Sequence, residues 1–181
     1  MNTTIVPLDE TARTCSEACS QRAASMWNKK VEKVMELCVG PSLKMLNLFY
    51  SYWDITCFGN DIDYRWKEAY PEGNWVIGDY KDVYLGHMDA VVFGPPLSRG
   101  CTGKREDSLM IDWVEPRYED FIEHTKNSHF WKVMVLPGRS LSTREDRNMF
   151  YKLMSKLDNP VIEMRTGKKR GITKYIDVIW K

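Results

Sequence analysis

The residues best suited to chemistry lie where hydrophobic runs end abruptly. The apolar run 90–93 ends in the triplet Gly94-Pro95-Pro96. Proline has no backbone N–H and fixes its own φ, so two in succession give a strand an open and rigid exit. Such a corner can hold main-chain carbonyl oxygens in a fixed direction toward a ligand. The sequence therefore predicts a reaction site here, although a purely structural strand exit would have the same pattern.

Acidic residues follow two other apolar runs. Asp61 and Asp63 come after the run 56–60, and Asp79 comes after the run 75–77. A carboxylate in such a place can accept hydrogen bonds from both hydroxyls of a ribose, and another can accept from an adenine amino group. The same aspartates could instead cap the helices that follow them.

A glycine-containing turn follows the strand predicted at 33–39 and can begin a helix. Glycine at such a turn lets a ligand approach the backbone and the positive end of the helix. Alone, this turn also fits many α/β proteins that bind no nucleotide. The candidate residues in and after this strand are Glu36, Cys38, Gly40, Pro41 and Ser42.

A polar and basic loop, residues 98–108, follows the double proline. Its cationic side chains can contact phosphates, or the loop can simply be solvated. An aromatic residue beyond it offers a surface on which a base can stack. The candidate substrate-binding residues are Ser98, Arg99, Lys104, Arg105 and Trp113.

The composition of the 181 residues is that of a folded, non-membrane protein: 43% are hydrophobic, 28% are charged and the net charge is +1. No apolar run is long enough to cross a membrane and the start lacks a secretory pattern, so we expect a cytoplasmic or other intracellular protein. The five cysteines match no zinc spacing, so we expect reduced thiols and no metal site.

Strand-like and helical periods alternate from residue 31 onward, which predicts a parallel sheet covered by helices on both faces. A basic turn joins the last two strands into an antiparallel hairpin. Ser142 and Glu145 have the spacing of a capping box before the last helix. The expected strands are 33–39, 56–60, 75–77, 88–93, 131–136, 161–165 and 175–180, and the expected helices lie near 8–30, 43–53, 64–70, 116–126 and 142–157.

Residues 31–181 resemble the class I S-adenosylmethionine-dependent methyltransferases in the order of these elements and motifs. The resemblance implies an α/β three-layer sandwich with a seven-stranded, mostly parallel sheet and an antiparallel terminal hairpin, preceded by an N-terminal helical segment at 1–30. It implies that ELCVGPS holds the methionine part of S-adenosylmethionine, NDID the ribose and GDY the adenine. The implied cofactor-binding residues are Glu36, Cys38, Gly40, Pro41, Ser42, Asp61, Ile62, Asp63, Asp79 and Tyr80.

The motif GPPLSRGCTGKR resembles the GPPC loop of the DNA cytosine carbon-5 methyltransferases, and more weakly the [DNS]-P-P-[YFW] signature of enzymes that methylate exocyclic amino groups. The implied catalytic residues are Gly94, Pro95, Pro96 and Leu97. Leu97 stands where the carbon-5 enzymes carry the cysteine that attacks the ring, and a leucine cannot do so. Cys101 could replace it only in a rebuilt loop. Relative to the amino-group enzymes, Gly94 lacks a side-chain acceptor and Leu97 lacks a stacking ring.

The sequence therefore predicts methyl transfer from S-adenosylmethionine to a nucleobase, in DNA or RNA or free, by direct displacement onto a nitrogen. One alternative is a binding or regulatory subunit that keeps the fold without catalysis, as the partner of an active subunit. Another is a transferase on the same fold that acts on a small metabolite.

Overall fold

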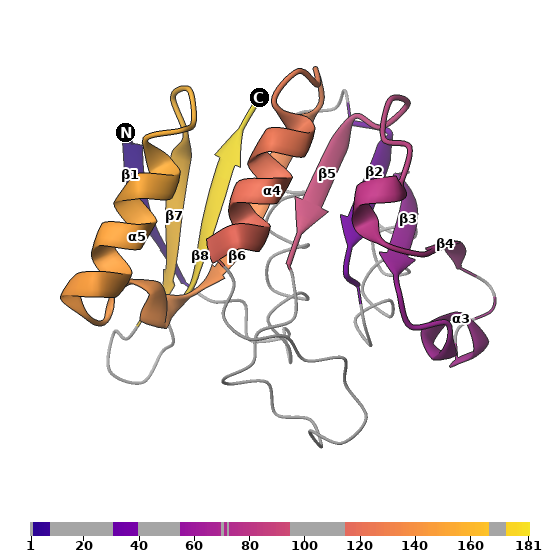
Figure 1. The fold of residues 1–181 in the computed structure, drawn as a ribbon, viewed down its shortest axis with the longest axis horizontal. Coiled ribbons are helices and arrows are strands. Elements are labelled where there is room, and N and C mark those ends of the chain that lie inside the picture. The colour runs from indigo at the N-terminus through magenta and orange to yellow at the C-terminus, as the bar shows by residue number, and fades with distance from the viewer. Residues whose placement is uncertain are drawn as a thin grey trace.

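A computed structural model describes residues 2–7, 31–39, 55–69, 71, 73–94, 115–166 and 173–181 of the chain. Eight strands in this part form one mixed sheet in the order β1-β7-β8-β6-β5-β2-β3-β4 (Figure 1). The strands are β1 (Asn2–Pro7), β2 (Lys33–Leu37), β3 (Thr56–Asp61), β4 (Asn74–Ile77), β5 (Ala90–Phe93), β6 (Trp131–Pro137), β7 (Val161–Thr166) and β8 (Thr173–Trp180).

The pairing confirms the predicted fold class, although the sheet has eight strands where seven were predicted, because β1 adds one at the edge. Strand β2 lies between β3 and β5 and is parallel to both, and β4 and β6 extend the parallel part on either side. Strand β8 is antiparallel to β6 and to β7, which makes the terminal hairpin. A mostly parallel sheet places the carboxyl ends of its strands along one edge.

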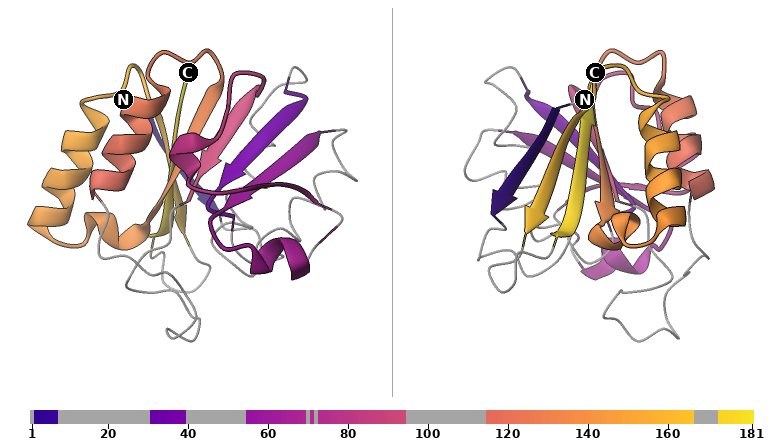
Figure 2. Two further views of the ribbon diagram at one scale, coloured as in Figure 1. Left: turned by 45° about the vertical axis from the view of Figure 1, so that its right-hand side comes forward. Right: turned by 90° about the vertical axis from the view of Figure 1, so that its left-hand side faces the viewer.

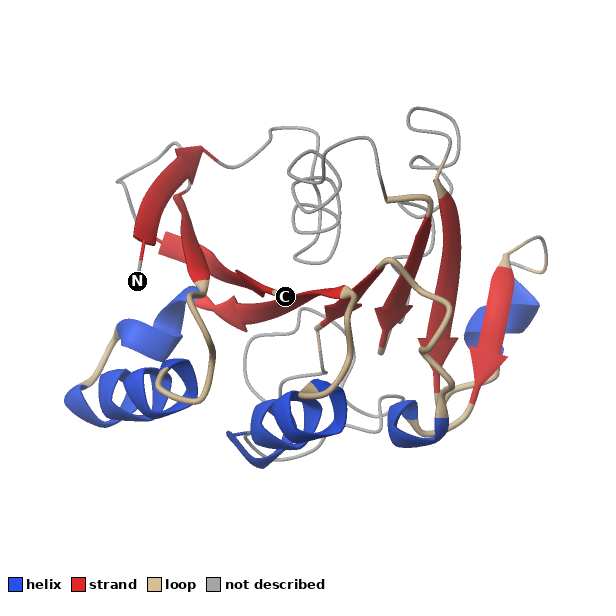
Figure 3. Ribbon diagram, turned by 90° about the horizontal axis from the view of Figure 1, so that it is seen from above, coloured by secondary structure: helices blue, strands red, loops and turns tan. Residues whose placement is uncertain are grey.

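Two longer helices, α4 (Glu115–Thr125) and α5 (Arg144–Met154), cover one face of the twisted sheet (Figures 2 and 3). The short helix α3 (Arg65–Ala69) follows β3, and the 3-10 turns η2 (Tyr80–Asp82) and η4 (Gly138–Leu141) follow β4 and β6. The helices predicted near 8–30 and 43–53, which would supply the third layer, lie outside the described residues.

The core lies on both faces of the sheet. On the α4 and α5 face, Phe93 stacks on Phe121 with ring centroids 4.5 Å apart and meets the edge of Tyr118 at 5.8 Å. The other face carries smaller side chains, among them Val92 and Val133. All four residues of β5 are buried, as expected for a central strand covered on both sides.

The N-terminus differs from the sequence prediction. Residues 1–30 were expected to be a helical segment, but Asn2–Pro7 forms strand β1, which pairs in parallel with β7. This stretch holds four consecutive β-branched residues, 3–6, which favour a strand, and Pro7 is tolerated because β1 is an edge strand. Strand β1 was therefore not predicted, whereas the helix expected near 8–30 lies outside the described residues.

The start of α5 also differs by one residue. Thr143 is the N-cap: its Oγ1 accepts from the backbone N–H of Asp146, whose carboxylate accepts from the N–H of Thr143, both at 3.1 Å. The capping box expected at Ser142 and Glu145 is therefore formed by Thr143 and Asp146. Aspartate can close this box as glutamate does, so two candidate starts existed one residue apart.

Candidate cofactor site at the carboxyl rim

The register of the parallel strands brings three strand ends together. Leu37 is paired with Asn60 of β3 on one side and with Phe93 of β5 on the other. The next residue of each strand or chain segment is Cys38, Asp61 or Gly94. These three residues therefore lie side by side at the edge of the sheet. The arrowheads of β2, β3 and β5 point to this edge in Figure 1. We call the edge formed by residues 38–39, 61–63, 78–80 and 94 the carboxyl rim.

Cys38 turns the chain at the end of β2. Its φ of 60° lies in the left-handed region, which favours glycine, and its side chain is half-buried. The next residue, Val39, donates its N–H to the carbonyl of Asn60 at 2.9 Å, which keeps the turn against β3. The backbone of residues 38–39 is thus fixed at the rim, directly before the predicted turn at 40–42, which lies outside the described residues.

Glu36, two residues earlier, is only 3% exposed. Its charge lies close enough to Cys57 of β3 to act on that thiol. Burial, and secondarily the Glu36 carboxylate, raise the pKa of Cys57 to about 12. Cys57 is therefore a protonated core residue at neutral pH and has no nucleophilic role.

Asp61 and Asp63 differ in their surroundings. Asp61 Oδ1 accepts from the N–H of Asp63 at 2.9 Å. Asp63 holds Arg65 through both carboxylate oxygens, with the closest contact at 2.6 Å, and accepts the N–H of Arg65 as well. The hydrogen bonds from Arg65 lower the pKa of Asp63. The sequence allowed two interpretations of these aspartates, ribose binding and capping of the following helix. Capping therefore fits Asp63 better than Asp61.

The end of β4 carries the third acidic residue. Asp61 is paired with Ile77, the last residue of β4, so Asp79 lies two residues beyond the end of the neighbouring strand. Asp79 is exposed, and its Oδ1 accepts from the N–H of Lys81 at 3.0 Å, which caps η2. Its Oδ2 has no hydrogen-bond partner among the described residues. This carboxylate is thus oriented by its own turn and keeps one oxygen for a ligand.

The remaining predicted residues near these strand ends are placed differently. Ile62 follows Asp61 and is 58% exposed. The ring of Tyr80 is 6% exposed and packs on Phe93, with centroids 5.0 Å apart, so it belongs to the core. Gly94 has room for a side chain, because an added Cβ would meet only the Cβ of Val135 at 4.0 Å.

The other predicted residues lie outside the described residues, so their roles remain predictions. They are Gly40, Pro41, Ser42, Pro95, Pro96, Leu97, Ser98, Arg99, Lys104, Arg105 and Trp113.

Sequence reasoning included Asn60 in the motif NDID but gave its side chain no role of its own. This residue is 1% exposed, and its Nδ2 donates to the carbonyls of Val76 and Gly78, each at 3.0 Å. An amide within a buried strand, directly before an acidic residue, was the signal that could have found it, because asparagine is depleted in strands. It ties the end of β3 to the turn that carries Asp79.

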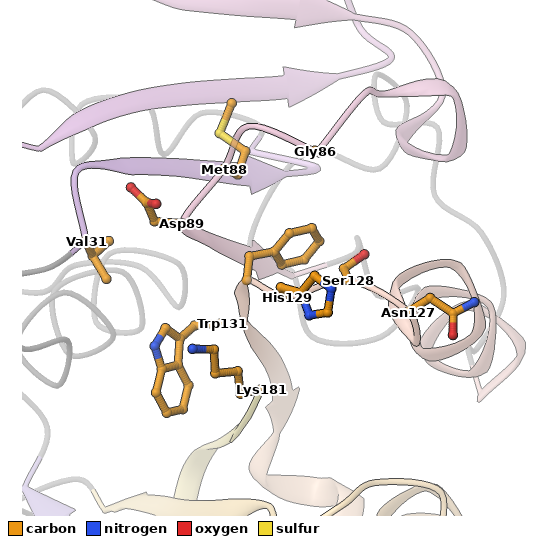
Figure 4. Close-up of a pocket in the computed structure, with 10 residues that line it drawn as sticks. Val31, Gly86, Met88, Asp89, Asn127, Ser128, His129, Trp131 and Lys181 are labelled. Atoms are coloured by element: carbon orange, nitrogen blue, oxygen red, sulfur yellow. The ribbon is translucent and has the colours of Figure 1, made fainter.

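The opposite edge of the sheet, which we call the amino rim, holds a cavity of about 650 Å³ (Figure 4). Asp89, Trp131 and Lys181 line it, and Lys181 Nζ lies 5.6 Å from the centre of a Trp131 ring. Oδ2 of Asp89 accepts from the backbone N–H groups of Glu32 and Lys33, both at 2.9 Å. This carboxylate oxygen joins the start of β5 to β2, and none of the described residues that line the cavity is a predicted site residue.

The described part of the chain contains no group of three or more histidine, cysteine, aspartate or glutamate side chains that could hold a metal ion. It also contains no helix that is long and apolar enough to span a membrane.

Strand order, the antiparallel hairpin and acidic strand ends together define the fold of the class I S-adenosylmethionine-dependent methyltransferases. Solved structures with this fold include the PH0226 protein from Pyrococcus horikoshii OT3, with a TM-score of 0.60 and 14% identity over 96% of this chain and 93% of that one. A SAM-dependent methyltransferase from Archaeoglobus fulgidus gives 0.59 and 13%, over 92% and 93% of the two chains.

The N-terminal domain of human METTL16, solved in complex with SAH, gives a TM-score of 0.59 and 10% identity over 90% of this chain and 66% of that one. No protein-family model matches the chain, and no curated protein sequence matches it. At such low identity the likeness establishes the fold, and the function must be argued from the site.

Proposed function

We propose that the protein binds S-adenosylmethionine at the carboxyl rim and transfers its methyl group to a nucleobase in DNA or RNA. The observation that carries the proposal is the placement of Asp61 and Asp79 at the ends of neighbouring parallel strands, beside the left-handed turn at Cys38. Ligands of open α/β sheets bind along this edge. Solved structures of the same fold include one in complex with SAH.

The residues present fit the cofactor. Asp61 is the proposed acceptor for the ribose hydroxyls, because Asp63 already holds Arg65. Asp79 offers Oδ2 to the adenine amino group, and the exposed Ile62 offers an apolar surface to the ring. Tyr80 contributes its backbone alone, since its ring is in the core.

The methionine part is assigned to the end of β2. The left-handed backbone of Cys38 exposes main-chain groups of the turn, and the buried Glu36 supplies negative charge beneath it. Negative charge is favourable near the ammonium group and the sulfonium of the cofactor. Gly40, Pro41 and Ser42 complete this end in the proposal.

Bound there, S-adenosylmethionine would supply a methyl group to the acceptor nitrogen; the electrons of the broken carbon–sulfur bond would remain on sulfur, and the proton lost from the methylated nitrogen would pass to water. The chain's part is positioning. Carbonyl oxygens of the corner formed by Gly94, Pro95 and Pro96 accept hydrogen bonds from the amino group and hold its nitrogen in line. With Leu97 in place of a cysteine, attack on ring carbon 6 has no nucleophile, which favours a nitrogen acceptor.

The nucleic-acid acceptor rests on the loop after the corner. Arg99, Lys104 and Arg105 would contact phosphates, Ser98 would donate to the backbone, and Trp113 would stack on an extruded base. A base inside a duplex must be flipped out at a cost of a few kcal/mol, and the basic loop would offset part of that cost.

Gly94 and Leu97 also favour a second candidate, a non-catalytic binding or regulatory subunit that keeps the fold and supports an active partner. Both positions lack the side chains that related enzymes use on the acceptor.

Isothermal titration calorimetry with S-adenosylmethionine, followed by transfer of a labelled methyl group to DNA, RNA and free nucleosides, tests the proposal. Binding by the wild type, weaker but measurable binding in Asp79→Ala and label on nucleic acid are expected. Binding without transfer to any of these acceptors would favour the non-catalytic subunit. Absence of binding in the wild type would contradict methyl transfer and favour the non-catalytic subunit.

A further inference from the structure

We infer that Asn60 is a positioning residue, whose side-chain amide fixes the turn after β4 and thereby orients Asp79 toward the adenine. The inference rests on the proposed function, since it assigns Asp79 the same role. Asn60 contacts no ligand in this scheme. It acts through hydrogen bonds to the backbone on the way to Asp79.

The contacts of Asn60 link the two strands beyond their ladder. Asn60 is the register partner of Val76, and its Nδ2 donates to the carbonyl of Val76 and to that of Gly78, both at 3.0 Å. An amide nitrogen carries two hydrogens. Both are used, and both end on the segment that leads from β4 into η2.

Gly78 is thereby held on both of its backbone groups. Its carbonyl accepts from Asn60, and its N–H donates to the carbonyl of Asp61 at 3.0 Å. Its φ of 148° is one that side chains rarely allow, although an added Cβ would meet nothing within 4 Å. The backbone conformation therefore requires glycine, and the hydrogen bonds must stabilise a segment that glycine leaves free to move.

Asp79 follows this clamped residue directly. Its backbone is extended, with φ −62° and ψ 134°, and its Oδ1 accepts from the N–H of Lys81 at 3.0 Å. The direction of the carboxylate thus depends on how Gly78 ends and how η2 begins. Loosening Gly78 would leave Asp79 on the surface but pointing in many directions.

The surroundings of Asn60 indicate that its side-chain amide is needed as a donor. Asn60 is 1% exposed, and Leu37, its register partner in β2, is fully buried. Within the described part of the chain, its Oδ1 has no hydrogen-bond partner. A buried acceptor without a partner is destabilising, and a leucine of similar size would avoid that cost. The two N–H groups are therefore what this position uses.

The test compares Asn60→Leu with Val34→Ala. Val34 is a core residue of β2 on the opposite face of the sheet from Asn60. Nuclear magnetic resonance measures amide hydrogen exchange at Gly78 and Lys81, and calorimetry measures affinity for S-adenosylmethionine. Asn60→Leu should speed exchange at both amides and weaken binding, each by about tenfold, the equivalent of one hydrogen bond. Val34→Ala should lower the melting temperature and leave affinity and exchange at these two amides unchanged.

A double-mutant cycle tests whether Asn60 affects affinity for S-adenosylmethionine through Asp79. If Asn60 acts through Asp79, Asn60→Leu should cost no further affinity in an Asp79→Ala background. Additive losses would overturn the inference.

Asn60→Asp covers the case in which the leucine variant does not fold. Its ionised carboxylate donates nothing, whereas the protonated form offers one donor, so affinity should recover as the pH falls. Affinity that does not change with pH relative to the wild type would count against the role of the donors.

The outcomes separate this inference from the proposed function. A wild type that does not bind S-adenosylmethionine contradicts the proposed function and the positioning role with it, while the exchange data still decide whether Asn60 holds the turn. A wild type that binds, with an Asn60→Leu variant of unchanged affinity, overturns the positioning role alone.

Discussion

The two rims of the sheet use aspartates in different ways. At the amino rim, a single oxygen of Asp89 accepts two backbone N–H groups, from Glu32 and Lys33. At the carboxyl rim, Asp79 uses one oxygen to cap its own turn and keeps the other. The amino rim has the cavity of about 650 Å³, whereas the carboxyl rim has acidic residues on successive strands.

This difference teaches that volume alone does not identify a site. A carboxylate that already joins two strands has a structural task. The carboxyl rim instead places the partly buried Asp61 and the exposed Asp79 beside backbone positions of positive φ, Cys38 and Gly78. Positive φ alone is not distinctive, because Asn159 has a φ of 45° just before β7, so the combination with acid groups is what sets this rim apart.

The largest expected effect is that of Asp61→Ala. Removing a carboxylate that accepts from two hydroxyls should weaken S-adenosylmethionine binding by roughly 100-fold or more, since each hydrogen bond to a charged group contributes about 1.5–3 kcal/mol and two are lost. Calorimetry measures it. Asp63→Ala is the matched control, because Asp63 holds Arg65 and should matter less. Equal losses in the two variants would contradict the division of roles.

The second effect concerns stability at the other rim. Asp89→Ala should lower the free energy of unfolding by about 2 kcal/mol, because two backbone N–H groups lose a charged acceptor. Denaturant unfolding measures this loss. Affinity for S-adenosylmethionine should be unchanged in the folded variant. A large loss of affinity would show that the amino rim takes part in binding.

Substitutions at Cys38 test whether the left-handed backbone at the carboxyl rim is strained. Cys38→Val should destabilise the protein by about 1–2 kcal/mol, because a β-branched residue is strained at a φ of 60°. Cys38→Gly should change stability by less than about 0.5 kcal/mol, as relief of strain and greater freedom of the unfolded chain oppose each other. Unfolding midpoints in urea compare the two, and equal midpoints would refute the strain.

The smallest effect is a pH effect at Asp63. Arg65 lowers the pKa of Asp63, so the ion pair contributes stability above the carboxyl's ordinary pKa, and this is lost as the pH falls through the lowered value. Arg65→Gln should return the pKa toward its ordinary value and flatten that part of the stability profile. Carbon-detected titration of the carboxylate measures the shift. An unchanged pKa would mean that Arg65 does not hold Asp63.

Much of the fold could be predicted because the signals were local. The short apolar run of β5 ends at a double proline, and β4 ends at a glycine before an acidic residue. Strand β1 was missed because its six residues stand before a long stretch with helical spacing, and parallel pairing with β7 joins residues far apart in the sequence.

The site was predictable where strand ends carry it, as for Asp61 and Asp79. The site was not predictable where the direction of a side chain decides its role. Tyr80 follows Asp79 but turns its ring onto Phe93, and Asn60 reaches across to β4. Neither direction follows from residue type, because each depends on the turn after β4.

The most direct test of the central claim is a titration of the labelled protein with S-adenosylhomocysteine, followed by amide chemical shifts. The account predicts that the shift changes gather at the carboxyl rim while the amino rim stays unchanged. The reporters are Cys38, Asp61, Ile62, Gly78, Asp79 and Gly94 for the first, and Asp89, Trp131 and Lys181 for the second. Changes centred on the amino rim, or no changes at saturating ligand, would contradict it.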